Sequence, residues 1–329
     1  MEKYLIDIPV ALIFFNRDDT LKEVFEQVRK AKPSKLFLIQ DGAREGRQDD
    51  VEGIVACRKI VENIDWECEV HKNYSEENLG CGRRVSSGIS WAFESVDRAV
   101  ILEDDCIIEP TFINFCEELL EKYKDDDRVC MISALNHFVD WDCGDNSYFF
   151  AKTGAIAAWA TWKRVWDVFD FKIEAFGDDY VKKLIESSFK HKYAAKARMK
   201  NWQNVYDMGK NNGNIRYWGP QFGFVKYRTA ALTIIPSHSL SNNVGVGAKA
   251  TFSGSGAEFM KKSMRSWFFQ KTRPMEFPLN HPEAILPDWD YDKKYYDITY
   301  PNPIINFATN VFYFCKRKVY SIFKKIIER

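Results

Sequence analysis

The 329-residue sequence has few of the residues that form ready-made metal or redox sites. It contains five histidines, and its eight cysteines are scattered at positions 57, 68, 81, 106, 116, 130, 143 and 315. They form no CxxC pair and no zinc-ligand spacing. Scattered thiols of this kind are typical of reduced cysteines in the core of a cytosolic protein. The sequence therefore indicates neither a zinc site nor a disulfide framework.

Net charge and long apolar runs are also missing. The 47 basic and 47 acidic residues cancel, so bulk charge does not favour nucleic-acid binding. No apolar run approaches the roughly 20 residues that span a bilayer. The start, "MEKYLIDIPVALIFF", lacks the basic region and cleavage site of a signal peptide. We therefore expect a cytoplasmic protein, and the 46% of apolar residues predict a substantial core.

Strand-like and helix-like segments alternate over the first 135 residues. Short apolar runs typical of buried strands are "PVALIFFNR", "KLFLIQDG", "WECEVHKN", "AVILEDD" and "RVCMISAL". Helical periodicity separates them, for example in "TLKEVFEQVRKAK" and "TFINFCEELLEKY", and "NLGCGRR" is predicted to be a loop before a helix. This alternation predicts an α/β fold with a mostly parallel sheet flanked by helices.

Polar residues follow several of the predicted strands directly. They are Asn16-Arg17, Asp41-Gly42 and the acidic triplet Glu103-Asp104-Asp105. In a parallel sheet, ligands collect beyond the carboxyl ends of the strands, so these residues are expected to converge on one site.

The triplet has two interpretations. Adjacent carboxylates at a strand end can hold a divalent cation, because one or two protein carboxylates suffice when a diphosphate and water complete the coordination. Alternatively, the acids cap the helix expected near Thr111, where the helix dipole favours negative charge.

The motifs resemble a known family. "PVALIFFNRDDTLKEVF", "KLFLIQDG", "NLGCGRRVSSGISWAFESVDRAVILEDDCIIEPTFINFCEELLEKYKDDDRV" and "AWATWKRVWDVFD" resemble the bacterial nucleotide-diphospho-sugar transferases of GT-A fold, which are related to the N-acetylglucosaminyltransferase I group. With "YWGPQF" and "IIPSHSLSNNVGVGAKATF", the resemblance covers roughly positions 9 to 255.

The resemblance implies a glycosyltransferase that uses Mn²⁺ or Mg²⁺ and a UDP-sugar donor, with inverting stereochemistry. The triplet takes the place of the family's DXD motif. Asp105 is then the direct metal ligand, Asp104 faces the ribose or sugar, and Glu103 supports them. A divalent cation would stabilise the charge that develops on the departing diphosphate.

The resemblance also implies the other donor contacts. Asp41 would contact the uracil, Asn16 and Arg17 would line the nucleotide pocket, and Arg83, beside Arg84, would approach the diphosphate. Asn243 matches the family's Asn-Ile-Gly pattern.

The glycine-rich segment 241–256 is predicted to be a lid over the donor. The alternative for the second half of this segment, "SGSG", is a surface loop without such a role.

One position departs from the family pattern. Relatives often carry an acidic residue just after the tryptophan matched by Trp218, and this chain has Gly219. An inverting transferase needs a carboxylate to take the proton of the acceptor hydroxyl. Asp207 is the first substitute predicted here, followed by Asp178 and Asp179.

The aromatic segment "AIAAWATWKRVW" has tryptophans at helical spacing. Trp159, Trp162 and Trp166 are expected to pack a helix onto the sheet, and one of them is a candidate sugar platform in the acceptor site.

The tail "IINFATNVFYFCKRKVYSIFKKIIER" has six basic residues and one acidic residue, with apolar residues at alternating three–four spacing. A basic amphipathic helix of this kind can lie on an anionic membrane surface, or it can pack on its own domain or on a dimer partner. On the first interpretation the enzyme is peripheral on the inner face of the membrane.

These features combine into one prediction. Residues 1–135 form the nucleotide-sugar-binding half of a GT-A domain, 136–300 its acceptor-binding half, and 301–329 a tail helix. The predicted function is transfer of a sugar to a glycan, and a lipid-linked surface polysaccharide is the favoured acceptor. A scaffold that binds a nucleotide sugar without turnover is an alternative. A sugar-nucleotide pyrophosphorylase is disfavoured because "FFNRDDTLKEVF" contains no glycine for a phosphate loop.

Overall fold

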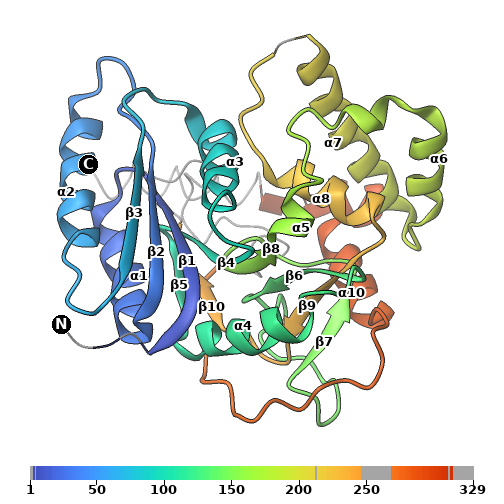
Figure 1. Cartoon of the computed structure of the whole chain (residues 1–329). Coiled ribbons are helices and arrows are strands. Elements are labelled where there is room, and N and C mark those ends of the chain that lie inside the picture. Colours follow the sequence, from blue (N-terminus) through green and yellow to red (C-terminus); the bar gives the residue numbers. More distant parts are fainter. Residues whose placement is uncertain (1–2, 4, 212, 246–267, 310–311, 314–329) are drawn as a thin grey trace, which may run out of the picture.

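The computed structural model describes all residues except 1–2, 4, 212, 246–267, 310–311 and 314–329 (Figure 1). The strands are β1 Ile6–Phe14, β2 Pro33–Gln40, β3 Glu69–Tyr74, β4 Arg98–Glu103, β5 Cys106–Ile108, β6 Val129–Ser133, β7 Tyr148–Ala151, β8 Trp159–Trp162, β9 Leu232–Pro236 and β10 Ser241–Asn243. The helices are α1 Asp18–Ala31, α2 Gln48–Val61, α3 Gly80–Ala92, α4 Thr111–Lys122, α5 Lys163–Trp166, the 3₁₀ helix η1 Glu174–Gly177, α6 Asp179–Ser187, α7 Lys192–Lys210, α8 Gly219–Arg228 and α10 Trp289–Thr299.

A mostly parallel eight-stranded sheet forms the centre of the molecule, and helices flank it, as predicted (Figure 1). Its strand order is β3-β2-β1-β4-β8-β6-β9-β7, and β5 and β10 form a separate antiparallel pair. Strands β3, β2, β1 and β4 run parallel, whereas β8 is antiparallel to both of its neighbours and β7 is antiparallel to β9.

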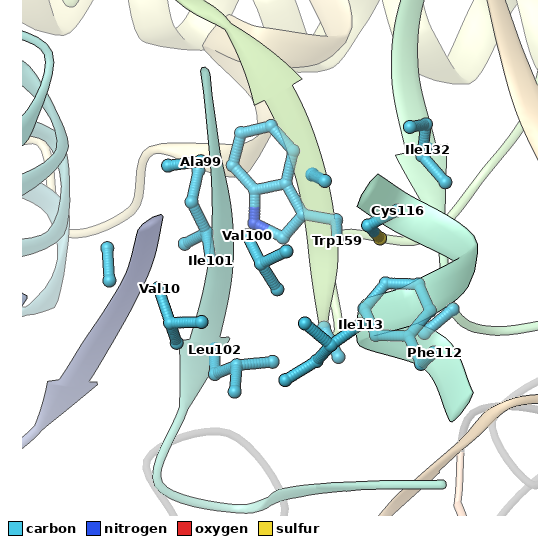
Figure 2. Packing of buried hydrophobic residues seen from close by; sticks show 14 of the residues in the cluster. Val10, Ala99, Val100, Ile101, Leu102, Phe112, Ile113, Cys116, Ile132 and Trp159 are labelled. Carbon is cyan, nitrogen blue, oxygen red and sulfur yellow. The ribbon is translucent and has the colours of Figure 1, made fainter. Parts of the chain in front are cut away.

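The core is densest around β1 and β4. In β1 the residues from Val10 to Phe14 are all buried, as expected for a strand covered on both faces. Figure 2 shows β4 side chains packed between Val10 of β1 and Trp159 of β8, with Phe112 and Ile113 of α4 against them. This rigid centre fixes the ends of β1 and β4, where the candidate site lies.

The second half adds helices with a core of their own. Helices α6, α7 and α8 lie together, away from α1 and α2 (Figure 1). Buried Phe176, Trp202 and Phe224 belong to a cluster separate from that of the sheet.

The tryptophan-rich segment was predicted to be one helix, and this was wrong in part. Trp159 and Trp162 lie in β8, and Trp166 ends the short α5. All three are buried, so their predicted role in the core is confirmed. Four consecutive buried residues in a central strand override the helical spacing.

The boundary predicted at residue 135 falls inside one continuous sheet, because β6 and β8 are neighbours in it. Most of the predicted tail helix lies outside the described residues, but the chain is helical from 303 to 309. In the part of the chain that the structure describes, no helix is both long and apolar enough to cross a membrane.

Candidate functional site

The carboxyl ends of three neighbouring strands meet at one edge of the sheet. Phe14 of β1 pairs with Gln40 of β2, and Ile13 pairs with Glu103 of β4. The polar residues that follow these strands therefore lie side by side. The structure brings Asn16, Arg17, Asp41 and the triplet to this edge.

Arg17 holds the last two acids of the triplet. Its guanidinium donates to Asp104, and its Nη1 lies 2.9 Å from Oδ2 of Asp105. The second carboxylate oxygen of Asp104 accepts a hydrogen bond of 3.1 Å from the backbone N–H of Phe15. Burial opposes the charge on Arg17, but the pKa of Arg17 is raised because Asp104 and Asp105 stabilise the cation. Arg17 is thus the counter-charge of the site.

Glu103 is the least compensated of the three acids. Burial, then the negative charges of Asp105 and Asp104, raise its pKa to about 8, and Arg17 opposes this only in part. The pKa of Asp104 is raised to about 6, mainly by burial, against the attraction of Arg17. Within the described residues Glu103 accepts no hydrogen bond at its carboxyl group, so it is free to interact with a ligand.

Two adjoining cavities open at this edge. The larger one is about 310 Å³ and is lined by Arg17, Cys81, Glu103, Asp105, Cys106, Ile156, Ala157, Tyr217, Trp218, Gly219, Pro220, Asn243, Gly245 and Phe268. The smaller one is about 240 Å³ and is lined by Ile13, Phe14, Phe15, Asn16, Arg17, Asp41, Arg44, Asn78, Gly80, Cys81, Arg84, Val85, Glu103 and Asp104. They share Arg17, Cys81 and Glu103, so the acidic triplet stands between them.

Asp41 organises the wall of the smaller cavity. Its two oxygens accept hydrogen bonds from the backbone N–H groups of Leu79 and Gly80, both at 2.9 Å, and from Gly42 at 3.1 Å. Burial nevertheless raises its pKa, against these hydrogen bonds. Asp41 therefore holds the start of α3 in place.

Asn16 is engaged in the same cavity, since its amide donates to Asp50 at 2.7 Å.

The prediction of a flexible loop at "NLGCGRR" was wrong, because α3 begins at Gly80. A carboxylate at its N-terminus supplies the missing acceptors, which favours a helix there. As a result Arg83 is exposed and lines neither cavity. Arg84 lies in the smaller cavity instead, where its guanidinium donates to the backbone and side-chain oxygens of Asn73.

Residues 243–245 close against the triplet. Strand β10 pairs with β5, and the backbone N–H of Val244 donates to the carbonyl of Asp105 at 2.9 Å. A Cβ at Gly245 would lie 2.0 Å from Oδ2 of Asp105, so a larger residue there would force the Asp105 carboxylate to move. Asn243 lines the larger cavity, as expected, and accepts from the N–H of Gly245 at 2.8 Å. The rest of the predicted lid, from residue 246, lies outside the described residues.

The three acids predicted as substitute bases do not reach the site. Asp207 is exposed on α7 and accepts from Gln203, Asp178 caps α6, and Asp179 pairs with Lys182. Their helices pack into the separate helical cluster, so none of the three lines either cavity. This corrects the prediction, which had relied on proximity in the sequence.

Sequence reasoning missed Tyr217 and Trp218 as cavity residues. Trp218 precedes α8, whose first turn holds Pro220 where a missing N–H costs nothing. It stacks on Trp159 with centroids 5.6 Å apart and is buried. The segment around Tyr217 packs closely against α3 at Gly82, where the absence of a side chain permits the approach. A Cβ at Gly82 would lie only 2.8 Å from the backbone N of Tyr217. Two aromatic residues directly before Gly219 and Pro220, in the run "YWGP", were the feature of the sequence that could have indicated a cavity wall.

Asp105 is a triplet residue whose side chain lines the larger cavity without a hydrogen bond from the backbone of the described residues, so it is the candidate ligand for a divalent cation. Among the described residues, no three His, Cys, Asp or Glu side chains converge on a ready-made metal cluster. Asp105 faces the larger cavity, where its Oδ2 lies 2.9 Å from Nη1 of Arg17 and its Oδ1 lies 3.4 Å from the amide of Asn243. Both oxygens of Asp104 are engaged as well. A cation held by Asp105 alone, with substrate oxygens and water completing its coordination, would take the place of the Arg17 contact.

Neither the models of known protein families nor the curated proteins match this chain. Among solved structures, it is similar to a cytidylyltransferase from Leptospira borgpetersenii serovar Hardjo-bovis. The two are 8% identical, and the match covers 65% of this chain and 75% of that chain with a TM-score of 0.28. A likeness at this level supports no functional assignment, which depends instead on the geometry of the site.

Proposed function

We propose that this protein is a metal-dependent glycosyltransferase of GT-A fold that takes a sugar from a UDP-sugar donor. The observation that carries the proposal is the position of the acidic triplet between two cavities at the carboxyl edge of a parallel sheet. Ligands of such sheets bind at this edge. The resemblance to the N-acetylglucosaminyltransferase I group supports the same assignment.

The smaller cavity is proposed to hold the nucleotide. Phe14 and Phe15 supply apolar surface there, and Arg84 supplies positive charge for an anionic ligand. The guanidinium of Arg44, by contrast, is paired with Asp50 at 2.6 Å. Asp41 shapes this cavity through its hydrogen bonds to Leu79 and Gly80, so we assign it a positioning role.

Asp105 would hold Mn²⁺ or Mg²⁺ in the larger cavity. When bound, the cation stabilises negative charge on the diphosphate leaving group. Gly245 and Asn243 orient Asp105 through the contacts described above. Tyr217 and Trp218 enclose the opposite wall and exclude water that would hydrolyse the donor.

Glu103 is proposed to accept the proton of the acceptor hydroxyl in place of Asp207, Asp178 and Asp179. Besides Asp105, it is the carboxyl group that lines the larger cavity in the described part of the chain. Its position beside Asp105 places a carboxylate oxygen in the cavity where the acceptor hydroxyl would lie.

The decisive experiment measures UDP release from a panel of UDP-sugars with and without Mn²⁺, comparing wild type with Asp105→Ala. We expect metal-dependent release that the substitution lowers by at least 100-fold. Glu103→Gln should retain binding of the donor but lose transfer to an acceptor. Absence of both donor binding and metal-dependent release with every nucleotide sugar would overturn the proposal.

Two other functions are outcomes of the same assay. Donor binding without turnover in the presence of acceptor extracts would indicate the scaffold alternative. Formation of radiolabelled UTP and a sugar 1-phosphate from a UDP-sugar and radiolabelled pyrophosphate would indicate a pyrophosphorylase.

The acceptor is proposed to be a glycan, with a lipid-linked surface polysaccharide as the favoured class. Ile304, Ile305, Phe307 and Phe312, at the start of the tail, are all more than half exposed, at 78%, 59%, 71% and 63%. Such apolar side chains, followed by a basic sequence, support binding to an anionic membrane. Full-length protein should co-sediment with anionic liposomes more than a 1–303 variant, and equal recovery would overturn this assignment.

A further inference from the structure

A third cavity adjoins the larger one on the side away from the nucleotide. It is about 250 Å³ and shares Ile156, Gly219 and Pro220 with the larger cavity. The rest of its lining comes from the segment after β7, from α7, α8 and α10, and includes Lys152, Arg198, Lys226, Tyr227 and Tyr296. A group bound here would lie next to the reacting end of the donor site.

Three cationic side chains line this cavity. Lys226 is only 6% exposed, and its Nζ donates a hydrogen bond of 3.0 Å to the carbonyl of Thr153. Lys152 donates from Nζ to the carbonyl of Ala230. Arg198 makes no hydrogen bond or ion pair to any residue in the described ranges, and its Nε is buried. Its guanidinium lies 5.8 Å from the centre of the Tyr300 ring.

The cations are not matched by carboxylates. Asp292 is the nearest acid, but its oxygens accept hydrogen bonds from the N–H groups of Lys152 and Thr153, both at 2.9 Å, and from the Thr153 hydroxyl at 2.7 Å. Within the described part of the chain, no carboxylate lies within 4 Å of the three cationic groups. Partly buried cations that have carbonyl partners but no carboxylate partner keep an uncompensated positive charge, which an anionic ligand would neutralise.

The cavity also suits a sugar ring. The hydroxyls of Tyr227 and Tyr296 are hydrogen-bonded to each other at 2.5 Å, and Phe222 and Met131 supply apolar surface. Gly223 leaves room beside Arg198, whose Nη1 would lie 3.7 Å from a Cβ at that position. A volume of about 250 Å³ far exceeds the ~10–15 Å³ that one water requires.

We propose that Lys152, Arg198 and Lys226 form a binding subsite for an acidic group of the acceptor, either a carboxylate or a phosphate. The inference rests on the proposed function, since it names the acceptor of that transfer as an anionic glycan. Gly219 lies between this subsite and the donor cavity, so an acceptor anchored by its acidic group can present a hydroxyl to the donor. An arginine and two lysines recognise carboxylates and phosphates alike.

The test measures direct binding to full-length protein by isothermal titration calorimetry, with UDP and Mn²⁺ saturating the donor site. The probes are glucuronate, inorganic phosphate and, as a neutral control, glucose. We expect wild type to bind at least one of the two anions and to bind glucose at least tenfold more weakly. The preferred anion distinguishes a uronate-bearing acceptor from a phosphate-bearing one.

Arg198→Gln and Lys226→Met should each weaken anion binding at least tenfold, whereas Arg198→Lys should retain most of it. Lys200→Gln, on the exposed side of the same helix, is the matched control and should bind as wild type does. Thermal unfolding identifies any variant that fails to fold, and Arg198→Lys then still provides the comparison.

Equal anion binding by wild type and folded Arg198→Gln, or no anion binding by wild type, would overturn the subsite. Failure of UDP to bind would instead count against the donor site, because the two measurements are separate.

Discussion

The two ends of the proposed active site have opposite electrostatics within a chain of zero net charge. At the end of β4 three acids surround a single arginine, Arg17, which pairs with two of them. The cavity beyond Gly219 is lined by three cations and, among the described residues, by no acid. The oxygens of Asp292, in the neighbouring α10, are already engaged by hydrogen bonds. Whole-chain charge therefore says nothing about ligands, because each cavity carries its own excess.

The two ends of the site also differ in the role of the oppositely charged residue, Arg17 at the acidic end and Asp292 near the cationic cavity. Arg17 compensates the acids directly, whereas Asp292 fixes the backbone at Lys152 and Thr153 and leaves the cations available. Two of the three acids are therefore paired with a cation, whereas the three cations have no carboxylate partner among the described residues. Four predictions test this contrast.

Arg17→Gln should have the largest effect on stability. It leaves Asp104, whose side chain is 4% exposed, without its ion pair, and loss of a buried partner costs about 3 kcal/mol or more. Urea unfolding should show this loss, and Arg17→Gln/Asp104→Asn should recover a large part of it. Arg98→Gln breaks the exposed pair with Glu121 and should cost under about 1 kcal/mol. An equal loss of unfolding free energy in Arg17→Gln and Arg98→Gln would show that the Arg17 pair is worth no more than an exposed one.

Gly245→Ala should impair transfer without unfolding the protein. The added Cβ would displace Asp105, and a misplacement of about 1 Å can cost about 100-fold in rate. The measurement is metal-dependent UDP release, with the melting temperature as a check on folding. Val244→Ala alters the same segment without adding an atom near Asp105, so a similar loss in that variant would argue against this mechanism.

Lys226 should give anion binding a pH dependence. Burial is the largest cause that lowers its pKa to about 8; Arg198 and Lys152 act in the same direction, and Cys130 and Asp292 oppose them. The lysine is charged below this pH, so glucuronate binding should weaken a few-fold as the pH rises above about 8. Lys226→Arg remains charged and should flatten the profile. The same pH dependence in Lys226→Arg would assign the titration to another group.

Glu103→Gln should also change how the stability of the protein depends on pH. The pKa of Glu103 rises from about 4.5 unfolded to about 8 folded, because of burial and then of Asp105 and Asp104. The protonated form therefore contributes stability that is complete below pH 4.5 and lost as the pH rises through 8. The melting temperature of Glu103→Gln, relative to wild type, should be higher at pH 9 than at pH 5. Exposed Glu94→Gln should show no such trend.

Local sequence predicted much of the fold and part of the site. The runs "PVALIFF" and "AVILE" are apolar throughout, which is sufficient to predict buried parallel strands, and the polar residues that follow them converge as expected. The same reasoning failed at Arg83, because Asp41, 39 residues away along the chain from Gly80, converts a predicted loop into the first turn of α3.

The choice of catalytic acid failed for a related reason. Asp207 was selected because it precedes Trp218 in the sequence, yet α7 packs against its own helical core and carries Asp207 to the surface. Helix α7 instead contributes Arg198 to the cationic cavity. A helix has the same periodicity whichever of its faces meets the active site, so sequence alone could not make this choice.

The sequence by itself determined the parallel sheet and the acidic residues at the end of β4. Both depend on residues adjacent in the chain: continuous apolar runs form strands buried on both faces, and the acids follow one of these runs directly. Only the tertiary structure decided which charges are compensated. Arg17 meets Asp104 across 87 positions, and Lys152, Arg198 and Lys226 meet through three separate elements. Electrostatic pairing depends on distance in space, and packing sets that distance.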